Sequence, residues 1–437
     1  MKKSFLIIGL MIALTSIGNA QEKIKMTVED AIQTGLKNSK TLDASSMKVV
    51  AAEARKKEVI AGLLPSVKFN AGYRRLSEVD PFEINTPFGN FVVSPSILDN
   101  YTTQLTVAQP LFAGFRLLSG AKIASKNYEA TKEDFQKDQS DLIYNIQNAY
   151  WNLFKAEQMK KVIDENVSMI QAHVNDATNL LNAGLLTTND KLKFEVQLSD
   201  AQLKQLDAGN NVRLAMIGLN NVLSIPLTTE IEIASEVKRS EAEFGELNTL
   251  VNSAIDERPE VKAAELRVKA AEYGVTAAKA GWYPQISVSG NLYYSRPNQR
   301  IVPAEDKFNS TWDVGVNLSM NIWDWLTTAH QTEQAKAQLA QGVDALGIIK
   351  DGVSLEVNQY YLLVNQLKRR IELSELTVKQ AEENMRVTSE RFKGGTALST
   401  DAIDAEVSLL SAKINYTNSL VDFELSKARL KKALGKE

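Results

Sequence analysis

The chain repeats itself over more than a hundred residues, and the two copies stay in register. Counting 211 positions on from Ile146 leads to Val357, and counting the same distance from Tyr150 leads to Tyr361. The same spacing joins Leu111-Phe112 to Ile322-Trp323, Gly184 to Gly395, Asp190 to Asp401, Leu219 to Leu430 and Leu223 to Leu434. Upstream of Pro65 the spacing becomes 219, as from Pro65 to Pro284. Each copy is about 200 residues long, far longer than a solenoid unit.

This pattern predicts one large supersecondary unit that has been duplicated. Repeat 1 covers residues 22–225 and repeat 2 covers 244–435, with a linker over 226–243. The change of spacing falls between Pro65 and Pro110, so we expect a loop of different length there.

Residues 1–20 have the composition of a cleavable secretory signal. Lys2 and Lys3 precede an apolar run, and Gly18-Asn19-Ala20 places small residues before the expected cleavage point. The mature protein is therefore expected to cover residues 21–437, and no cysteine is present to anchor it to lipid.

Composition excludes several classes of protein. The chain has no cysteine, so it has neither disulfides nor thiolate metal sites. Its formal net charge of −3 argues against a nucleic-acid partner, which usually requires a basic face. After the signal, no apolar stretch reaches the length that a membrane-spanning helix needs.

Two long helices are predicted, over about 115–181 and 325–392. Both segments lack proline, and apolar residues recur in steps of three or four, a spacing close to the heptad of packed helices. A helix of this length extends for roughly 100 Å.

Each long helix is expected to reverse direction in a glycine turn. Gly184 marks the first turn, and Gly394 and Gly395 mark the second. The returning helices, about 189–224 and 400–434, are only half as long. Further half-length helices are predicted over about 27–61 and 247–280, so that two short helices match each long one.

Four segments alternate between apolar and polar or small residues in the manner of strands. They are residues 67–74, 102–107, 285–292 and 314–320. Alternation over about ten residues is typical of strands with lipid on one face and water on the other. Aromatic residues stand near the predicted strand ends, where a membrane–water interface favours them. The candidates are Tyr101, Phe112, Trp282, Tyr283, Trp312 and Trp323.

Four strands cannot close a barrel, and an open sheet edge in lipid leaves backbone groups without partners. Copies of the chain must therefore pool their strands, giving eight in a dimer, twelve in a trimer or sixteen in a tetramer. The alternative is a secreted helical protein with four surface strands, which leaves the aromatic residues and the strand lengths unexplained.

The order of helix, hairpin, long helix, tip and returning helix, present twice, resembles the TolC family of outer-membrane channel proteins. The resemblance covers residues 22–435, and its most specific matches are the tips that end in Asp190 and Asp401, the openings at Pro65 and Pro284, and the pair Leu434-Gly435. It implies a homotrimer with mixed α and β structure, in which long antiparallel helical hairpins form a coiled-coil-like α-barrel and the strands form a shared twelve-stranded transmembrane β-barrel. It also implies a periplasmic adaptor protein and an inner-membrane pump as partners, with drugs, proteins or ions as possible cargo.

The resemblance places a periplasmic gate at Asp190, Asp401 and Asp404. Asp401 and Asp404 are three residues apart, so both lie on one helix face and would form rings of charge in a trimer. The alternative is that an acid in the first helical turn only stabilises the helix dipole. A tyrosine and an arginine that help close the family prototype align with Phe392 and Ala397, so other groups must close this entrance, with Arg391 and Lys393 as candidates.

An enzyme is not predicted. The two histidines, His173 and His330, have no catalytic partners at useful spacing, and no motif indicates a metal or a cofactor. We therefore expect a passive trimeric export channel in the outer membrane that extends into the periplasm. The alternative is a non-conducting helical scaffold or adhesin of the cell envelope.

Overall fold

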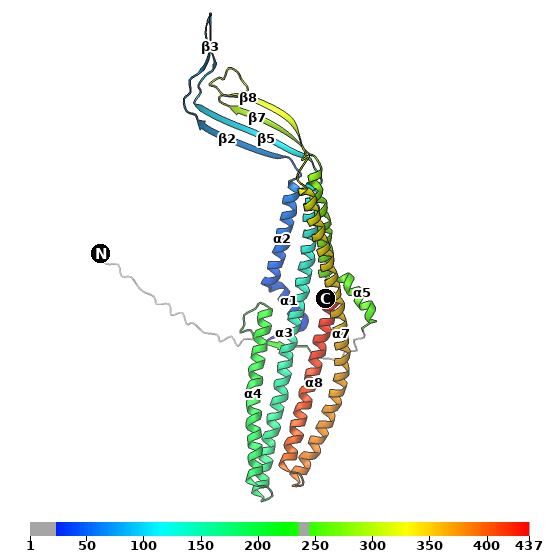
Figure 1. The fold of residues 1–437 in the computed structure, drawn as a ribbon. Helices are drawn as coiled ribbons and strands as arrows, with labels where there is room; N and C mark the ends of the chain where they lie inside the picture. Colours follow the sequence, from blue (N-terminus) through cyan, green and yellow to red (C-terminus); the bar gives the residue numbers. More distant parts are fainter. Residues whose placement is uncertain (1–22, 236–243, 437) are drawn as a thin grey trace, which may run out of the picture. The chain divides into compact units, whose positions relative to one another are not determined.

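The computed structural model describes residues 23–235 and 244–436 (Figure 1). The predicted signal over 1–20 and the later part of the predicted linker lie outside the described residues. The chain divides into two compact units. The two long helices, α3 (Arg116–Asn182) and α7 (Thr327–Lys393), contribute residues to both units and have 67 residues each. Their predicted positions are confirmed.

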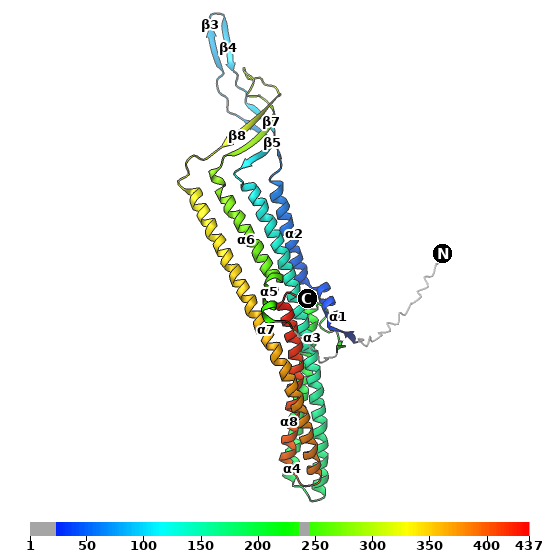
Figure 2. The ribbon, with the colours of Figure 1, turned by 90° about the vertical axis from the view of Figure 1, so that its right-hand side faces the viewer.

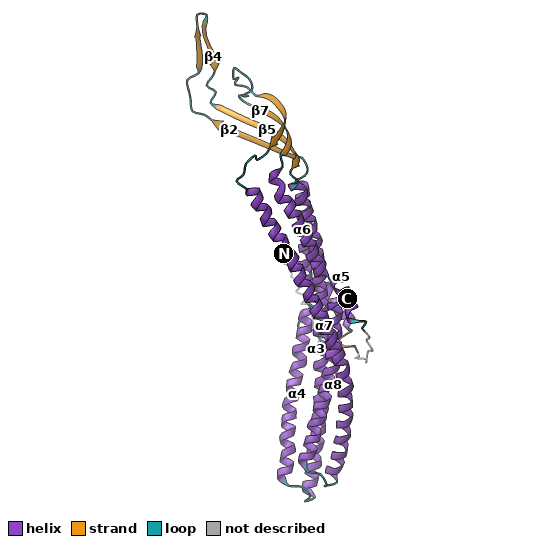
Figure 3. Ribbon diagram, turned by 45° about the vertical axis from the view of Figure 1, so that its right-hand side comes forward, coloured by secondary structure: helices purple, strands orange, loops and turns teal. Residues whose placement is uncertain are grey.

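One unit contains a four-stranded antiparallel sheet in the order β2-β5-β7-β8 (Figure 3). The strands are β2 (Ser66–Arg75), β5 (Asp99–Ala113), β7 (Gln285–Ser295) and β8 (Asn309–Ser319). All four predicted strands are confirmed. The two repeats each provide one hairpin, and β5 and β7 join the hairpins at the centre of the sheet.

The two faces of this sheet differ in polarity. On one face, cross-strand register brings Phe69, Leu105, Leu292 and Trp312 into one row, and all four side chains are exposed. On the other face, Asn291 Oδ1 accepts from Thr106 Oγ1 at 2.8 Å, and Asn291 Nδ2 donates to Asp313 Oδ1 at 2.8 Å. An exposed apolar face backed by a polar one is the arrangement expected of a strand between lipid and water.

Aromatic side chains gather at both ends of the sheet. At the end joined to the helices, Phe112, Phe115 and Tyr283 make edge-to-face contacts, with ring centroids 5.3–6.3 Å apart. At the other end, Tyr101 contacts Tyr73 at 5.0 Å and Phe308 at 5.7 Å. The remaining predicted positions are Trp282 just before β7, Trp323 just after β8, and Trp312, which is the fourth residue of β8 rather than at its end.

The first loop contains structure that the sequence analysis did not predict. The loop expected between Pro65 and Pro110 includes a hairpin of β3 (Phe82–Thr86) and β4 (Gly89–Ser94). Pro87 falls in its tight turn, where Thr86 Oγ1 donates to the carbonyl of Gly89 at 2.8 Å. A proline is compatible with a turn although it is excluded from a central strand, so its presence did not argue against a hairpin.

The same unit contains α2 (Lys40–Ala61), α5 (Leu247–Glu257) and α6 (Pro259–Ala278) (Figure 2). The predicted helix over 247–280 is wrong at one point, because Arg258 has an extended backbone with ψ of 129°. The residue before a proline is biased away from the helical region, and Pro259 follows. Arg258 is buried and forms ion pairs with Glu260 and Glu356.

The other unit contains α1 (Val28–Asn38) and the returning helices α4 (Thr188–Val222) and most of α8 (Ser399–Ala433). The predicted returning helices are confirmed. The predicted helix over 27–61 is also divided, because Ser39 is extended with ψ of 111°. The apolar core of this unit includes the buried side chain of Tyr150, together with residues of α1, α3, α4 and α8.

A short parallel pair of strands in this unit was not predicted. β1 (Ile24–Met26) pairs with β6 (Ile231–Ile233). The Tyr150 hydroxyl lies 2.9 Å from the carbonyl oxygen of Met26 and 2.7 Å from Ser235 Oγ, so it ties β1 and the segment just after β6 to α3. Within the described ranges, none of the helices combines the length and the apolar character that crossing a membrane requires.

The turn from strand to long helix has the same strained backbone in both repeats. Gly114 and Phe115 have φ of 61° and 68°, and the equivalent residues Trp325 and Leu326 have φ of 53° and 63°. Glycine adopts this region without a penalty, whereas a residue with a Cβ loses about 1–2 kcal/mol. A Cβ on Gly114 would also lie 2.5 Å from the carbonyl oxygen of Ala280.

We predict that Gly114→Ala lowers the free energy of unfolding by at least about 2 kcal/mol, because backbone strain and the clash add together. Denaturant unfolding of the detergent-solubilised protein measures this. Gly347→Ala is the matched control, since Gly347 lies exposed in α7 with nothing within 4 Å of a new Cβ. That variant is expected to be stabilised by up to about 1 kcal/mol. Equal effects of the two substitutions would contradict the prediction.

Candidate functional site

The two helix tips, where α3 meets α4 and α7 meets α8, are built alike. Gly184 and Gly395 have φ of 72° and 69°, the left-handed conformation that ends a helix. Leu185 N donates to the Leu180 carbonyl at 2.9 Å, and Thr396 N donates to the Arg391 carbonyl at 2.8 Å. Gly394 instead continues the helical pattern, donating to the Glu390 carbonyl at 3.0 Å. One glycine at each tip therefore makes the reversal.

Asp190 connects the two tips to each other. Its Oδ2 accepts from Thr187 Oγ1 at 2.6 Å, and its Oδ1 accepts from Lys193 Nζ at 3.2 Å, both on its own helix. Oδ1 also accepts from Ser399 Oγ at 2.9 Å, and Ser399 is the first residue of α8. These hydrogen bonds, led by those from Thr187 and Ser399, lower the pKa of Asp190 to about 2. The carboxylate is therefore charged throughout the physiological range.

Asp401 and Asp404 are both exposed and lie on the same side of α8. Asp401 Oδ2 accepts from the backbone N–H of Leu398 at 3.1 Å, which satisfies one of the free donors at the start of the helix. Among the described residues, no hydrogen bond or ion pair to the Asp404 carboxylate is present. Helix capping thus explains why an acidic residue stands at Asp401 and, in part, at Asp190. It does not explain the acidic residue at Asp404.

Phe392 and Ala397 lie in an apolar cluster at the tips. The Phe392 side chain is 1% exposed, and its ring lies 5.2 Å from that of Phe194. Ala397 packs against the same cluster, together with Ala402. Contacts between α3, α4, α7 and α8 are therefore made here by apolar side chains, supplemented by the ion pair between Lys393 and Asp176 at 3.7 Å. Arg391 donates to the Thr396 carbonyl at 3.4 Å, within its own turn.

His173 belongs to this cluster as a packing residue. Its side chain is buried, and its ring stacks on Phe194 with centroids 5.9 Å apart. Burial lowers the pKa of His173, so the imidazole is neutral near pH 7. His330 is exposed on α7, 3.8 Å from Glu333. In the part of the chain that the structure describes, no group of three or more acidic, histidine or cysteine side chains could hold a metal ion.

Glu406 is the polar residue of this region that the sequence analysis missed. Its side chain is fully buried on α8, and Oε1 accepts from Asn166 Nδ2 at 3.3 Å. Oε2 has no hydrogen-bond partner among the described residues. Burial raises the pKa of Glu406 to about 8. Counting helical positions from Ala402 and Ala405 to Leu409 places residue 406 on the buried side of α8, so the signal was present in the sequence.

We predict that Glu406→Gln stabilises the protein at neutral and alkaline pH. Below about pH 4.5 the carboxyl is protonated in both the folded and the unfolded chain. Between pH 4.5 and 8 only the folded chain keeps the proton, so the free energy of unfolding falls as pH rises through this window. The loss at pH 7 is on the order of 3 kcal/mol, and an amide avoids it.

Unfolding midpoints of both proteins at pH 4 and pH 8 measure this difference. The variant should be the more stable one at pH 8 and nearly equal to the wild type at pH 4. Glu195→Gln is the control, because Glu195 occupies the equivalent position in repeat 1, partly exposed and paired with Lys191 at 3.0 Å. A Glu406→Gln variant without a gain at pH 8 would show that the buried carboxyl is satisfied in another way.

Comparison with known proteins agrees with this architecture. A family model described as outer membrane efflux protein matches residues 31–224 and 250–436. Outer membrane efflux protein BepC of Brucella suis is 21% identical over 337 residues, which cover 77% of this chain and 72% of that protein. Proteases secretion protein PrtF of Dickeya chrysanthemi is 21% identical over 435 residues, which cover 95% of this chain and 89% of that protein.

The fold is also that of a solved structure. The outer membrane protein VceC from Vibrio cholerae matches with a TM-score of 0.81 at 18% identity, over 94% of this chain and 96% of that chain. At 18% identity, this structural similarity establishes a shared fold but not a shared function. The family model, by contrast, covers most of the chain and confirms the predicted resemblance, the export-channel function and the outer-membrane location. The chain belongs to the outer membrane efflux protein family.

Proposed function

We propose that three copies of this chain form one passive duct through the outer membrane, each giving its four strands to a twelve-stranded barrel. The sheet itself supports this most directly. In the described part of the chain, β2 and β8 are each paired on one side only, and the sheet exposes an apolar face. Bare strand edges in lipid are costly, so neighbouring copies must supply the missing hydrogen bonds.

Strand direction is compatible with closure. Each neighbouring pair in the order β2-β5-β7-β8 is antiparallel, so β8 runs opposite to β2. The β8 strand of one copy can therefore extend the antiparallel ladder to the β2 strand of the next. The polar face with Asn291 and Asp313 would then line the water-filled interior, and the face with Phe69 and Trp312 would contact outer-membrane lipid.

We also propose that each copy is built from two repeats of one helix–hairpin–helix unit. Residues 1–20 would be removed as a signal, and residues 21–437 would form the protomer with repeats 22–225 and 244–435 around the linker 226–243. The equal length of α3 and α7 supports this division, as do the two separate matches to the family model.

As an export duct without an energy source of its own, the protein needs partners. We infer a periplasmic adaptor and an inner-membrane pump, which would meet the helix tips. The names of the relatives cover efflux and protease secretion, so small molecules and proteins are both candidate cargo.

Conduction separates this proposal from a non-conducting scaffold or adhesin. The purified protein in a planar lipid bilayer is expected to give discrete current steps, because a closed barrel encloses water. Absence of any current at concentrations that insert trimers would favour the scaffold instead.

The proposed gate is at the helix tips. Asp401 and Asp404 of three copies would give two rings of three carboxylates, which attract multivalent cations. Asp190 has a different part in the proposal, since its bond to Ser399 joins the two tips of one copy. Asp404 is the main candidate for the gate, because helix capping explains the acid at Asp401 but not the one at Asp404.

We predict that multivalent cations added on the periplasmic side block the current, and that Asp401→Asn with Asp404→Asn removes the block. Loss of the bond to Leu398 N costs at most about 1 kcal/mol per copy, so the trimer should survive. Single-channel recording at increasing cation concentration measures the block. Asp344→Asn, which removes an exposed acid from α7 in the other unit, should leave it intact. Block that persists in the double variant would place the cation site elsewhere.

A further inference from the structure

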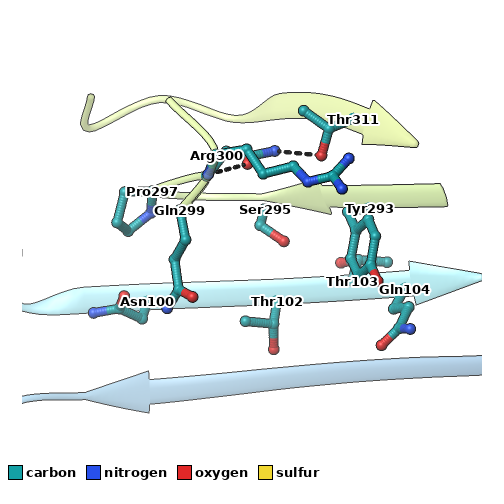
Figure 4. A pocket seen from close by; sticks show the side chains of 11 residues that line it. Asn100, Thr102, Thr103, Gln104, Tyr293, Ser295, Pro297, Gln299, Arg300 and Thr311 are labelled. Carbon is teal, nitrogen blue, oxygen red and sulfur yellow. Dashed lines mark hydrogen bonds between the residues drawn. The ribbon is translucent and has the colours of Figure 1, made fainter. Parts of the chain in front are cut away.

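The loop between β7 and β8 folds over the polar face of the sheet. Residues 297–300 lie above the strands and enclose a cavity of about 260 Å³ (Figure 4). The strands contribute Asn100, Thr102, Thr103, Gln104, Tyr293, Ser295 and Thr311 to its lining. The cavity is at the end of the sheet that carries Tyr101 and Phe308, away from the strand ends that lead into the helices.

Asn298 anchors this loop. Its side chain is 3% exposed, and Nδ2 donates to the Asn309 carbonyl at 3.0 Å and to Thr311 Oγ1 at 3.2 Å. Its Oδ1 accepts from the backbone N–H of Arg300 at 3.0 Å. Both polar atoms of the Asn298 amide are therefore bonded to the loop or to β8, and their three hydrogen bonds hold the loop down on the sheet.

Arg300 is positioned over the polar face by three contacts. Its Nη1 donates to the Trp312 carbonyl at 2.8 Å, and its Nη2 lies 3.4 Å from Asp313 Oδ2. The guanidinium is 5.9 Å from the centroid of the Tyr293 ring. Asp313 in turn accepts from Asn291 at 2.8 Å, so the pair is continuous with the polar network of the sheet. Half of the Arg300 side chain remains exposed beside the cavity.

The first hairpin loop is arranged differently. Its β3–β4 hairpin extends away from the four-stranded sheet (Figure 1). The hydrogen bonds near its base, from Leu76 N to the Leu98 carbonyl at 2.8 Å and from Val79 N to Ser96 Oγ at 3.4 Å, stay within the loop. Of the two described hairpin loops, the second therefore covers the polar face and the first does not, so the two repeats differ at this end of the sheet.

We propose that the loop at 297–300 narrows the outer mouth of the duct, and that the balanced charges of Arg300 and Asp313 keep the mouth from selecting small solutes by charge. This rests on the proposed function, in which the polar face lines the water-filled interior. Three copies would place three such ion pairs around one axis. While each pair is intact, its charges offset each other, and the mouth discriminates mainly by size.

Removal of one partner exposes the charge of the other. In Arg300→Gln, three carboxylates of Asp313 are left uncompensated, and a ring of negative charge favours cations. In Asp313→Asn, three guanidinium groups are left, and the mouth should favour anions. In the double variant both charges are gone, and the selectivity should return towards that of the wild type.

The experiment is the reversal potential of single channels in a planar bilayer under a gradient of potassium chloride. The two single variants should shift it in opposite directions, and Arg300→Lys, which keeps the charge, should stay close to the wild type. Glu83→Gln is the matched control, since it removes one charge from the exposed β3–β4 hairpin. It should give a smaller shift than either variant at the pair.

Shifts of the reversal potential in the same direction, or no shift in either single variant, would overturn the inference. If the pair were only structural, the shift in reversal potential would not depend on the sign of the charge that remains. Heat-resistant trimers on denaturing gels confirm that each variant is assembled before it is recorded. A wild-type protein that conducts no current would instead contradict the proposed function itself, so the two failures can be told apart.

Discussion

Backbone hydrogen bonding in lipid is the constraint on which the rest of this molecule depends. Each copy supplies four antiparallel strands, and in the described residues β2 and β8 end the sheet with unpaired edges. The exposed apolar face shows that the described part of the chain does not cover this side of its own sheet. A surface of this kind is stable only when other copies continue the ladder until it closes. That requirement explains why several copies must share one barrel, while the number three comes from the resemblance to the TolC family.

The helical unit around the tips meets a different requirement, because four helix ends must be held together with few residues. An apolar cluster of Phe194, Phe392 and Ala402 provides most of the contact, and the bond from Ser399 to Asp190 fixes the two turns to each other. A fully buried carboxyl at Glu406 works against this stability at neutral pH.

Elements with a long, regular pattern could be predicted from the sequence. Helices α3 and α7 repeat apolar residues over 67 positions, and each sheet strand alternates over about ten, so their periods are unambiguous. β1 and β6 have three residues each and pair over a separation of about 200 residues, which leaves no local signal. The break at Ser39 is followed by Lys40 rather than a proline, so no local signal marks it, and Ser39 is buried in the fold.

Some features of the candidate site could likewise be predicted from the sequence, and others could not. Capping by Thr187 and the acid at Asp190 follow from local rules, as does the common helix face of Asp401 and Asp404. The bond between Asp190 and Ser399 joins residues 209 positions apart, and the pair of Arg300 and Asp313 depends on how a loop folds back. Such contacts are fixed by three-dimensional arrangement and have no signature in the order of residues.

The most direct test of this account is a cross-link between the edge strands of neighbouring copies. The chain contains no cysteine, so a cysteine at Asn70 in β2, combined in turn with one at Asp313, Gly315 or Asn317 in β8, gives no background. Oxidation in membranes, followed by gel electrophoresis under denaturing conditions, should produce covalent products of two and three chains in at least one register, and none larger. Products of four or more chains, or none between chains in any register, would contradict a barrel shared by three copies.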